Sequence, residues 1–312
     1  MTYRLCQLFV FPLLLTASAF ADDFADHSHS PIIVRSRAVI ERLPVKVIDP
    51  IDVVVNSYRD TLIADRVGKI VFRVDAEQET SVVAKDLAGL ERVTDSGGSG
   101  IHVLIRATKA GKIVRLLENG FQETVCELAF APTGLATDSI GNLWTTDSET
   151  NKVLRYGADG RLKQTTQVTG ITADIAADDF GATVLLNSGK IVAVGADGSK
   201  KTIGYVTPSA TRIRLTSDGE AIVLAKDSNG KTMLLRPTTK PGTVDRFADT
   251  PDGTSAFAFD KLGNLTLANP TFRAVTQVTS HFMVPCPHCG QPVPMLLSPT
   301  APPHEKQTRR SF

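Results

Sequence analysis

Two cysteines near the C-terminus are the residues whose spacing most directly suggests chemistry. Cys286 and Cys289 lie in the stretch MVPCPHCGQPVPM, with a proline and a histidine between them and a glycine after them. A Cys-x-x-Cys pair followed by glycine is typical of one half of a tetrahedral zinc site. The chain has no second pair of this spacing, so zinc would need other ligands. We expect these to be His27 or His29 of the segment HSH, or residues of a second molecule.

The same cysteine pair has two other interpretations. A thiol oxidant relies on a helix N-terminus beside the pair, which lowers the pKa of the attacking thiol. The sequence that follows, GQPVPMLLSPTAPP, is too rich in proline to form that helix. An unliganded pair or a local disulfide also stays open.

Charged residues at one repeated position form the second candidate site. Equivalent places in segments that recur about every 40 residues are occupied by Asp52, Glu91, Asp174 and Arg212. Converging carboxylates supply the oxygen ligands that Ca²⁺ or another hard divalent cation takes. Alternatively, these acids are only solvated and Arg212 pairs with Asp174. Polar residues of the loops that follow each second strand are expected at the same end: Asp65, Asp147, Asn187, Asp227 and Asn269.

The elements that must position these residues are repeated β-strands. A basic residue that opens an apolar run recurs 38 to 43 residues apart, at Lys69, Lys112, Lys152, Lys190, Lys231 and Arg273. Each unit contains short strands separated by Gly-Asn or Asp-Gly turns, which favour tight hairpins. Four antiparallel strands per repeat of about 40 residues are typical of the blade of a β-propeller.

The repeats predict an all-β fold, a six-bladed β-propeller over residues 38–282. The sixth unit supplies only three strands, and the segment AVIERLPVKVID (38–49) precedes the first inner strand. We therefore expect this N-terminal segment to pair with the last blade and close the ring. The alternative is an open sandwich or two smaller β domains.

The third unit, PTGLATDSIGNLWTTDSETNKVLRYGADG (132–160), resembles the NHL-type repeat of streptogramin-lyase-like and gluconolactonase-like propellers. The resemblance implies six blades and a divalent metal in the central channel, held by acidic and amide side chains. It also implies metal-assisted opening of a lactone or elimination from an ester. The histidine acid or base expected of the lyase type has no counterpart here, because His102 falls within a predicted strand and the other histidines lie in the tails.

The ends of the chain have their own compositions. Residues 1–21 combine Arg4, an apolar run and a small-residue site, which is typical of a cleaved signal peptide. A polar arm (22–37) and a proline-rich tail that carries the Cys-Pro-His-Cys motif (283–312) flank the propeller. These features predict a secreted or periplasmic protein with no membrane anchor after cleavage.

Charge and composition narrow the expected partners. After loss of Arg4, 33 basic residues balance 33 acidic ones, which gives no electrostatic basis for nucleic-acid binding. The expected role is a binding or interaction module for a protein, a glycan or a small ligand. The alternative is a divalent-metal-dependent lactonase or lyase at the channel mouth. A monomer is expected, with a tail-mediated dimer as the alternative.

Overall fold

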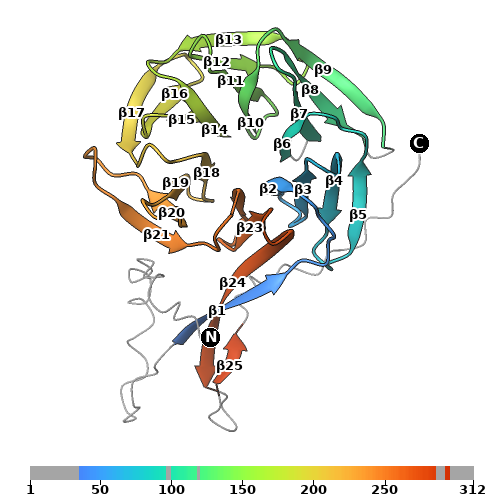
Figure 1. The fold of residues 1–312 in the computed structure, drawn as a ribbon, viewed down its shortest axis with the longest axis vertical. Helices are drawn as coiled ribbons and strands as arrows, with labels where there is room; N and C mark the ends of the chain where they lie inside the picture. The colour runs from blue at the N-terminus through green and yellow to red at the C-terminus, as the bar shows by residue number, and fades with distance from the viewer. Residues whose placement is uncertain (1–34, 96–99, 118–119, 286–291, 296–312) are drawn as a thin grey trace, which may run out of the picture. The chain divides into compact units, whose positions relative to one another are not determined.

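Six β-sheets, five with four strands and one with five, surround a common centre, as the repeats predict (Figure 1). The structure is a computed structural model, and it describes residues 35–95, 100–117, 120–285 and 292–295. Five of the sheets are built from consecutive strands, and the sixth combines strands from both ends of the chain. The fold is therefore all-β and a six-bladed propeller.

Each of the first five blades runs from an inner strand to an outer strand in chain order. The first two blades are β2 (Pro50–Val55), β3 (Thr61–Asp65), β4 (Ile70–Val74) and β5 (Thr80–Ala84), then β6 (Leu90–Asp95), β7 (Ile101–Arg106), β8 (Gly111–Leu116) and β9 (Gln122–Leu128). The third and fourth are β10 (Pro132–Thr137), β11 (Leu143–Asp147), β12 (Lys152–Tyr156) and β13 (Leu162–Gln167), then β14 (Thr172–Asp178), β15 (Gly181–Leu186), β16 (Lys190–Gly195) and β17 (Lys200–Tyr205). The fifth is β18 (Arg212–Leu215), β19 (Ala221–Lys226), β20 (Thr232–Arg236) and β21 (Asp245–Asp249).

The sixth blade confirms the predicted ring closure. It contains β22 (Ala256–Phe259), β23 (Leu265–Asn269) and β24 (Ala274–Pro285), and its outer strand is β1 (Arg35–Arg42) from the other end of the chain. Beside this pairing, the Leu43 amide donates to the Val275 carbonyl at 2.9 Å. The closing strand begins and ends earlier than the predicted 38–49 segment.

Apolar side chains fill the spaces between neighbouring blades. Between the first and second blades, for example, Leu62 and Val71 pack with Leu90 and Val103, and all four are fully buried. Between the fifth and sixth blades the packing is aromatic, with the rings of Phe247 and Phe259 edge to face at a centroid distance of 5.8 Å. Strands with two buried faces need apolar residues on both, which explains the continuous apolar runs in the sequence.

Acidic residues at the hairpin turns, such as Asp138 and Asp260, have a structural role. The Asp138 carboxylate accepts the Asn142 amide at 2.8 Å and the Trp144 indole N–H at 3.2 Å. Asp260 accepts the backbone amides of Leu262 and Asn264, each at 2.8 Å. These carboxylates stabilise turns by satisfying local N–H groups.

The C-terminal part of the chain forms a unit separate from the propeller body. Its described residues form a hairpin in which the end of β24 pairs with β25 (Pro292–Met295), with Phe282 opposite Met295 and Pro285 opposite Pro292. The start of the tail is therefore a β-hairpin. No helix in the described part of the chain is long and apolar enough to cross a membrane.

Candidate functional site

The inner strands place the predicted channel residues at one end of the propeller. Pro50 at the start of β2 lies opposite Asp65 at the end of β3, and Thr172 lies opposite Leu186 in the same way. The starts of the inner strands and the loops after the second strands therefore share one end. We call this end the channel mouth.

Asp52 and Asp174 are completely buried in the inner strands β2 and β14. Each carboxylate accepts a backbone amide from the inner strand of the next blade: Val93 donates to Asp52 and Ile213 donates to Asp174, both at 3.1 Å. A buried carboxylate needs such partners to offset its lost hydration. These two acids therefore join neighbouring blades.

Arg214 of β18 bridges the two acids. Its guanidinium lies 2.5 Å from Asp52 Oδ1 and 3.2 Å from Asp174 Oδ2. Burial alone would lower the pKa of Arg214, but Asp52 and Asp174 raise it above its usual value. The bridge therefore stays charged and connects the first, fourth and fifth blades.

Arg92, and not the predicted Glu91, occupies the position of Asp52 in the second blade. Arg92 pairs with Leu104 after an irregularity in the strand, as Asp52 pairs with Ala64, so the predicted register was one residue out. The Arg92 side chain is 5% exposed, and its Nε lies 3.4 Å from Asp174 Oδ1. Its NH2 also donates to the Thr133 carbonyl at 2.9 Å.

Glu91 lies at the edge of this group. Its side chain is 27% exposed and its carboxylate is 3.8 Å from Arg92 NH1. Within the network, its carboxylate therefore contacts Arg92 alone among the ion pairs of the described residues.

Gly134 provides the space that the network needs in the third blade. A Cβ at this position would lie 2.8 Å from the Ile175 side chain and 3.1 Å from Asp174 Oδ1. Only glycine allows the fourth blade to approach this closely. Its role is steric, whereas its counterparts carry charge.

Arg212 belongs to the same region but does not pair with Asp174. It is half-buried, and no carboxylate of the described residues forms an ion pair with it. Its NH1 donates to the Thr211 carbonyl at 3.1 Å, while its buried Nε has no hydrogen-bond partner. Burial, followed by repulsion from Arg92, lowers the pKa of Arg212 to about 10, against the opposing attraction of Asp174 and Asp52.

The channel carboxylates do not fit a divalent cation. The oxygens of Asp52 and Asp174 are occupied by the arginine side chains of Arg92 and Arg214 and by backbone amides. Within the described ranges, no group of three His, Cys, Asp or Glu side chains is placed to hold a metal ion.

The loop residues predicted at the mouth have other contacts. Asp147 is buried and accepts the amides of Glu149 and Thr150 at 3.0 and 3.2 Å, as a turn residue does. Asn187 is exposed at the end of its blade. Neither joins the network around Asp52 and Asp174.

The cysteine and histidine candidates fall mostly outside the described residues. Cys286, Cys289, His27 and His29 all lie there, so their predicted zinc site stays a prediction. Cys126 on β9 is a free thiol, and burial raises its pKa to about 11.

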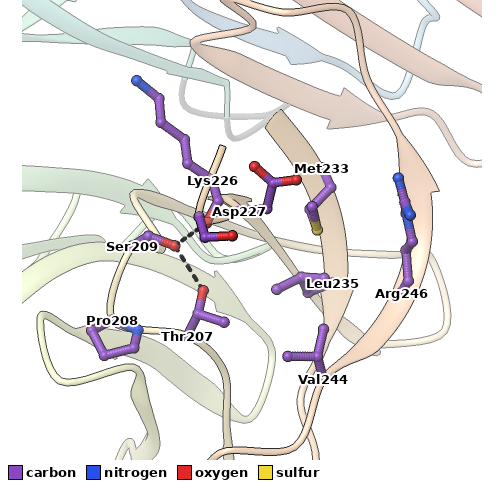
Figure 2. Close-up of a pocket in the computed structure, with 10 residues that line it drawn as sticks. Thr207, Pro208, Ser209, Lys226, Asp227, Met233, Leu235, Val244 and Arg246 are labelled. Atoms are coloured by element: carbon purple, nitrogen blue, oxygen red, sulfur yellow. Dashed lines mark hydrogen bonds between the residues drawn. The ribbon is translucent and has the colours of Figure 1, made fainter. Parts of the chain in front are cut away.

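A second hollow, of about 520 Å³, lies against the fifth blade (Figure 2). Lys226 at the end of β19 and Asp227 of the loop after it line the hollow together with the apolar Met233, Leu235 and Val244. The Ser209 hydroxyl in its wall bonds to Thr207 at 2.8 Å and donates to the Lys226 carbonyl. Arg246 is ion-paired with Asp249. These polar groups are satisfied within the chain, so the pocket shows less directed chemistry than the channel mouth.

Fold and site together define a class of protein: a six-bladed β-propeller whose centre is an arginine–carboxylate network. Solved structures confirm the fold. A gluconolactonase from Xanthomonas campestris is 14% identical with a TM-score of 0.62, and the match covers 78% of this chain and 90% of that one. Virginiamycin B lyase from Staphylococcus aureus is 12% identical with a TM-score of 0.55, over 78% of this chain and 99% of the lyase.

The chain is also similar to the WD40 repeats of RRP9, at 12% identity and a TM-score of 0.58, over 80% of this chain and all of that one. No protein-family model and no curated protein matches the sequence. Identities this low relate the chains by fold alone.

Sequence reasoning missed Arg92 and Arg214. The signal for Arg214 was its place two residues after Arg212, since alternate residues of a strand share a face. Its partner Asp52 is 162 residues away, and no local pattern connects the two.

Proposed function

We propose that this chain is an exported binding propeller that recognises a ligand or partner at its channel mouth and has no metal-dependent catalysis there. The observation that carries the proposal is the Arg214 bridge between Asp52 and Asp174. It places a fixed positive charge between the two carboxylates that a metal-dependent lactonase or lyase would use.

The structural neighbours include a lyase and a gluconolactonase, which keeps the metal-dependent enzyme as the second candidate. The observation in its favour is the burial of two carboxylates at equivalent positions of the inner strands. Against it, a cation would have to displace a guanidinium from both acids. That exchange leaves a buried arginine without its counter-charges, which is costly.

Export rests on the sequence of residues 1–21, which has the charge, apolar length and small-residue site of a signal peptide. Expression of the full chain with its leader in a bacterial host tests this. We expect the released protein to begin at about Asp22 by intact mass. Retention of residues 1–21 in the released protein contradicts export by cleavage.

A metal titration separates the two candidate functions. The chain is treated with EDTA, and its thermal melting is followed as Ca²⁺ or Mn²⁺ is added. We expect no shift in melting temperature and no metal-dependent turnover of simple lactones or esters. Stabilisation or turnover that depends on the cation and is lost in Asp174→Asn overturns the proposal.

A further inference from the structure

The charges of the channel network balance only if the partly exposed Glu91 is counted. Three guanidiniums, those of Arg92, Arg212 and Arg214, lie within electrostatic reach of one another, against the two buried carboxylates Asp52 and Asp174. Arg92 and Arg214 are both paired with these acids. The excess positive charge therefore resides on Arg212.

Arg212 is also the arginine of the network whose buried Nε lacks a hydrogen-bond partner among the described residues. Its one side-chain bond in the described structure goes to the neighbouring Thr211 carbonyl. An unpaired charge that is partly removed from water is unfavourable unless a counter-charge is supplied. A planar guanidinium is well suited to bind a carboxylate or phosphate with two parallel hydrogen bonds.

The chain itself does not supply this counter-charge. Arg214 occupies the facing oxygens of Asp52 and Asp174, and Glu91 contacts Arg92 at 3.8 Å. Glu91 is also partly exposed, so water screens its charge. Arg212 is half-buried, so part of its side chain is exposed to solvent.

We propose that Arg212 at the channel mouth binds an oxyanion group, a carboxylate or a phosphate, of the ligand that the propeller recognises. This inference rests on the proposed binding function and specifies its ligand class. The anion completes the network by neutralising its third guanidinium. Because Arg212 is the first residue of β18, the anion is recognised by the fifth blade.

The test measures binding of three matched probes, glucuronate, inorganic phosphate and glucose, by calorimetry at low ionic strength. We expect glucuronate or phosphate to bind and glucose not to bind. Binding of glucuronate alone identifies a carboxylate site, and binding of phosphate alone identifies a phosphate site. Binding of neither anion overturns the inference.

Substitutions locate the site. Arg212→Met should weaken anion binding about 10- to 100-fold, the loss typical of a charge-assisted pair. Arg212→Lys keeps the charge and loses the planar guanidinium. Its affinity for the anion should lie between those of wild type and Arg212→Met. Arg161→Met is the matched control, since Arg161 pairs with Asp159 and its side chain is 88% exposed, and it should bind like wild type. Equal binding by wild type and Arg212→Met contradicts the assignment.

Glu91 gives an independent readout of the same charge balance. Glu91→Gln removes the acid that partly offsets Arg92, so anion binding should become about two- to fivefold tighter, a change appropriate to a partly exposed charge. Weaker binding in this variant contradicts the charge argument. Binding of glucose but of neither anion overturns this inference and leaves the binding function in place, whereas metal-dependent turnover overturns both.

Discussion

Replacement of Arg214 by methionine tests whether the arginine–carboxylate network stabilises the propeller. The substitution keeps most of the side-chain length and removes the charge that bridges Asp52 and Asp174. Both acids are completely buried. Each would then keep its backbone donor but lose its closest counter-charge.

The expected cost follows from the burial of the acids. Removal of one partner from a buried ion pair typically costs about 3–5 kcal/mol, because the remaining charge stays out of water. For a domain the size of residues 41–277, each kcal/mol corresponds to roughly 2–4 °C of melting temperature. We therefore expect Arg214→Met to melt about 10 °C below wild type.

Thermal melting by circular dichroism and urea unfolding measure this change. Arg161→Met is again the control, because an exposed pair contributes at most about 1 kcal/mol. Removal of Asp52 together with the arginine, in Arg214→Met with Asp52→Asn, should restore part of the lost stability, because Asp174 keeps its pair with Arg92. A melting temperature of Arg214→Met within about 2 °C of wild type refutes the reasoning.

Three further predictions concern other residues. Burial, followed by the charge of Arg115, lowers the pKa of the buried His102 to about 4 from 6.5, so the unfolded chain binds its proton first as the pH falls. Its contribution to stability is complete above pH 6.5 and is lost toward pH 4, with about 2 kcal/mol lost between pH 7 and pH 5. Urea midpoints at the two pH values measure this loss. His102→Phe is chosen because the aromatic Trp144 occupies the equivalent place of the third blade. It should reduce the difference in stability between pH 7 and pH 5. An unchanged difference would mean that other groups cause it. Gly134→Ala should lower stability by about 1–3 kcal/mol, because its Cβ would overlap the Ile175 side chain, and unfolding at the wild-type urea midpoint contradicts the close approach. Purified chain should contain zinc that Cys286→Ser removes, as elemental analysis can show, and an unchanged zinc content excludes a site at this motif.

The fold could be predicted from the sequence because its signals are repeated. Turn residues and apolar runs recur once per blade, and each copy supports the same interpretation. Ring closure was also predictable, since the last unit lacks a strand and the N-terminus supplies one.

The site was predictable only in part, for two physical reasons. The second blade was aligned on Asp95, but this residue pairs with Ile101 and is equivalent to Thr137, not to the turn residue Asp138. Serine, asparagine, threonine and aspartate can all begin such turns, so an aspartate does not fix the register. The partners of the acids also come from distant blades, so local patterns suggest a metal site where arginines lie.

Closure of the ring by the two chain ends has a consequence for biosynthesis. Arg42 donates to the carbonyl of Arg273, a contact that spans 231 residues. During synthesis the N-terminal strand has no partner until nearly the whole propeller has been made, and a contact of such long range forms slowly. A product that stops before Ala274 would lack β24, which leaves β1 without a partner and an unpaired strand edge on β23. The final hydrogen bonds thus distinguish complete chains from truncated ones, which would be open to proteases and aggregation.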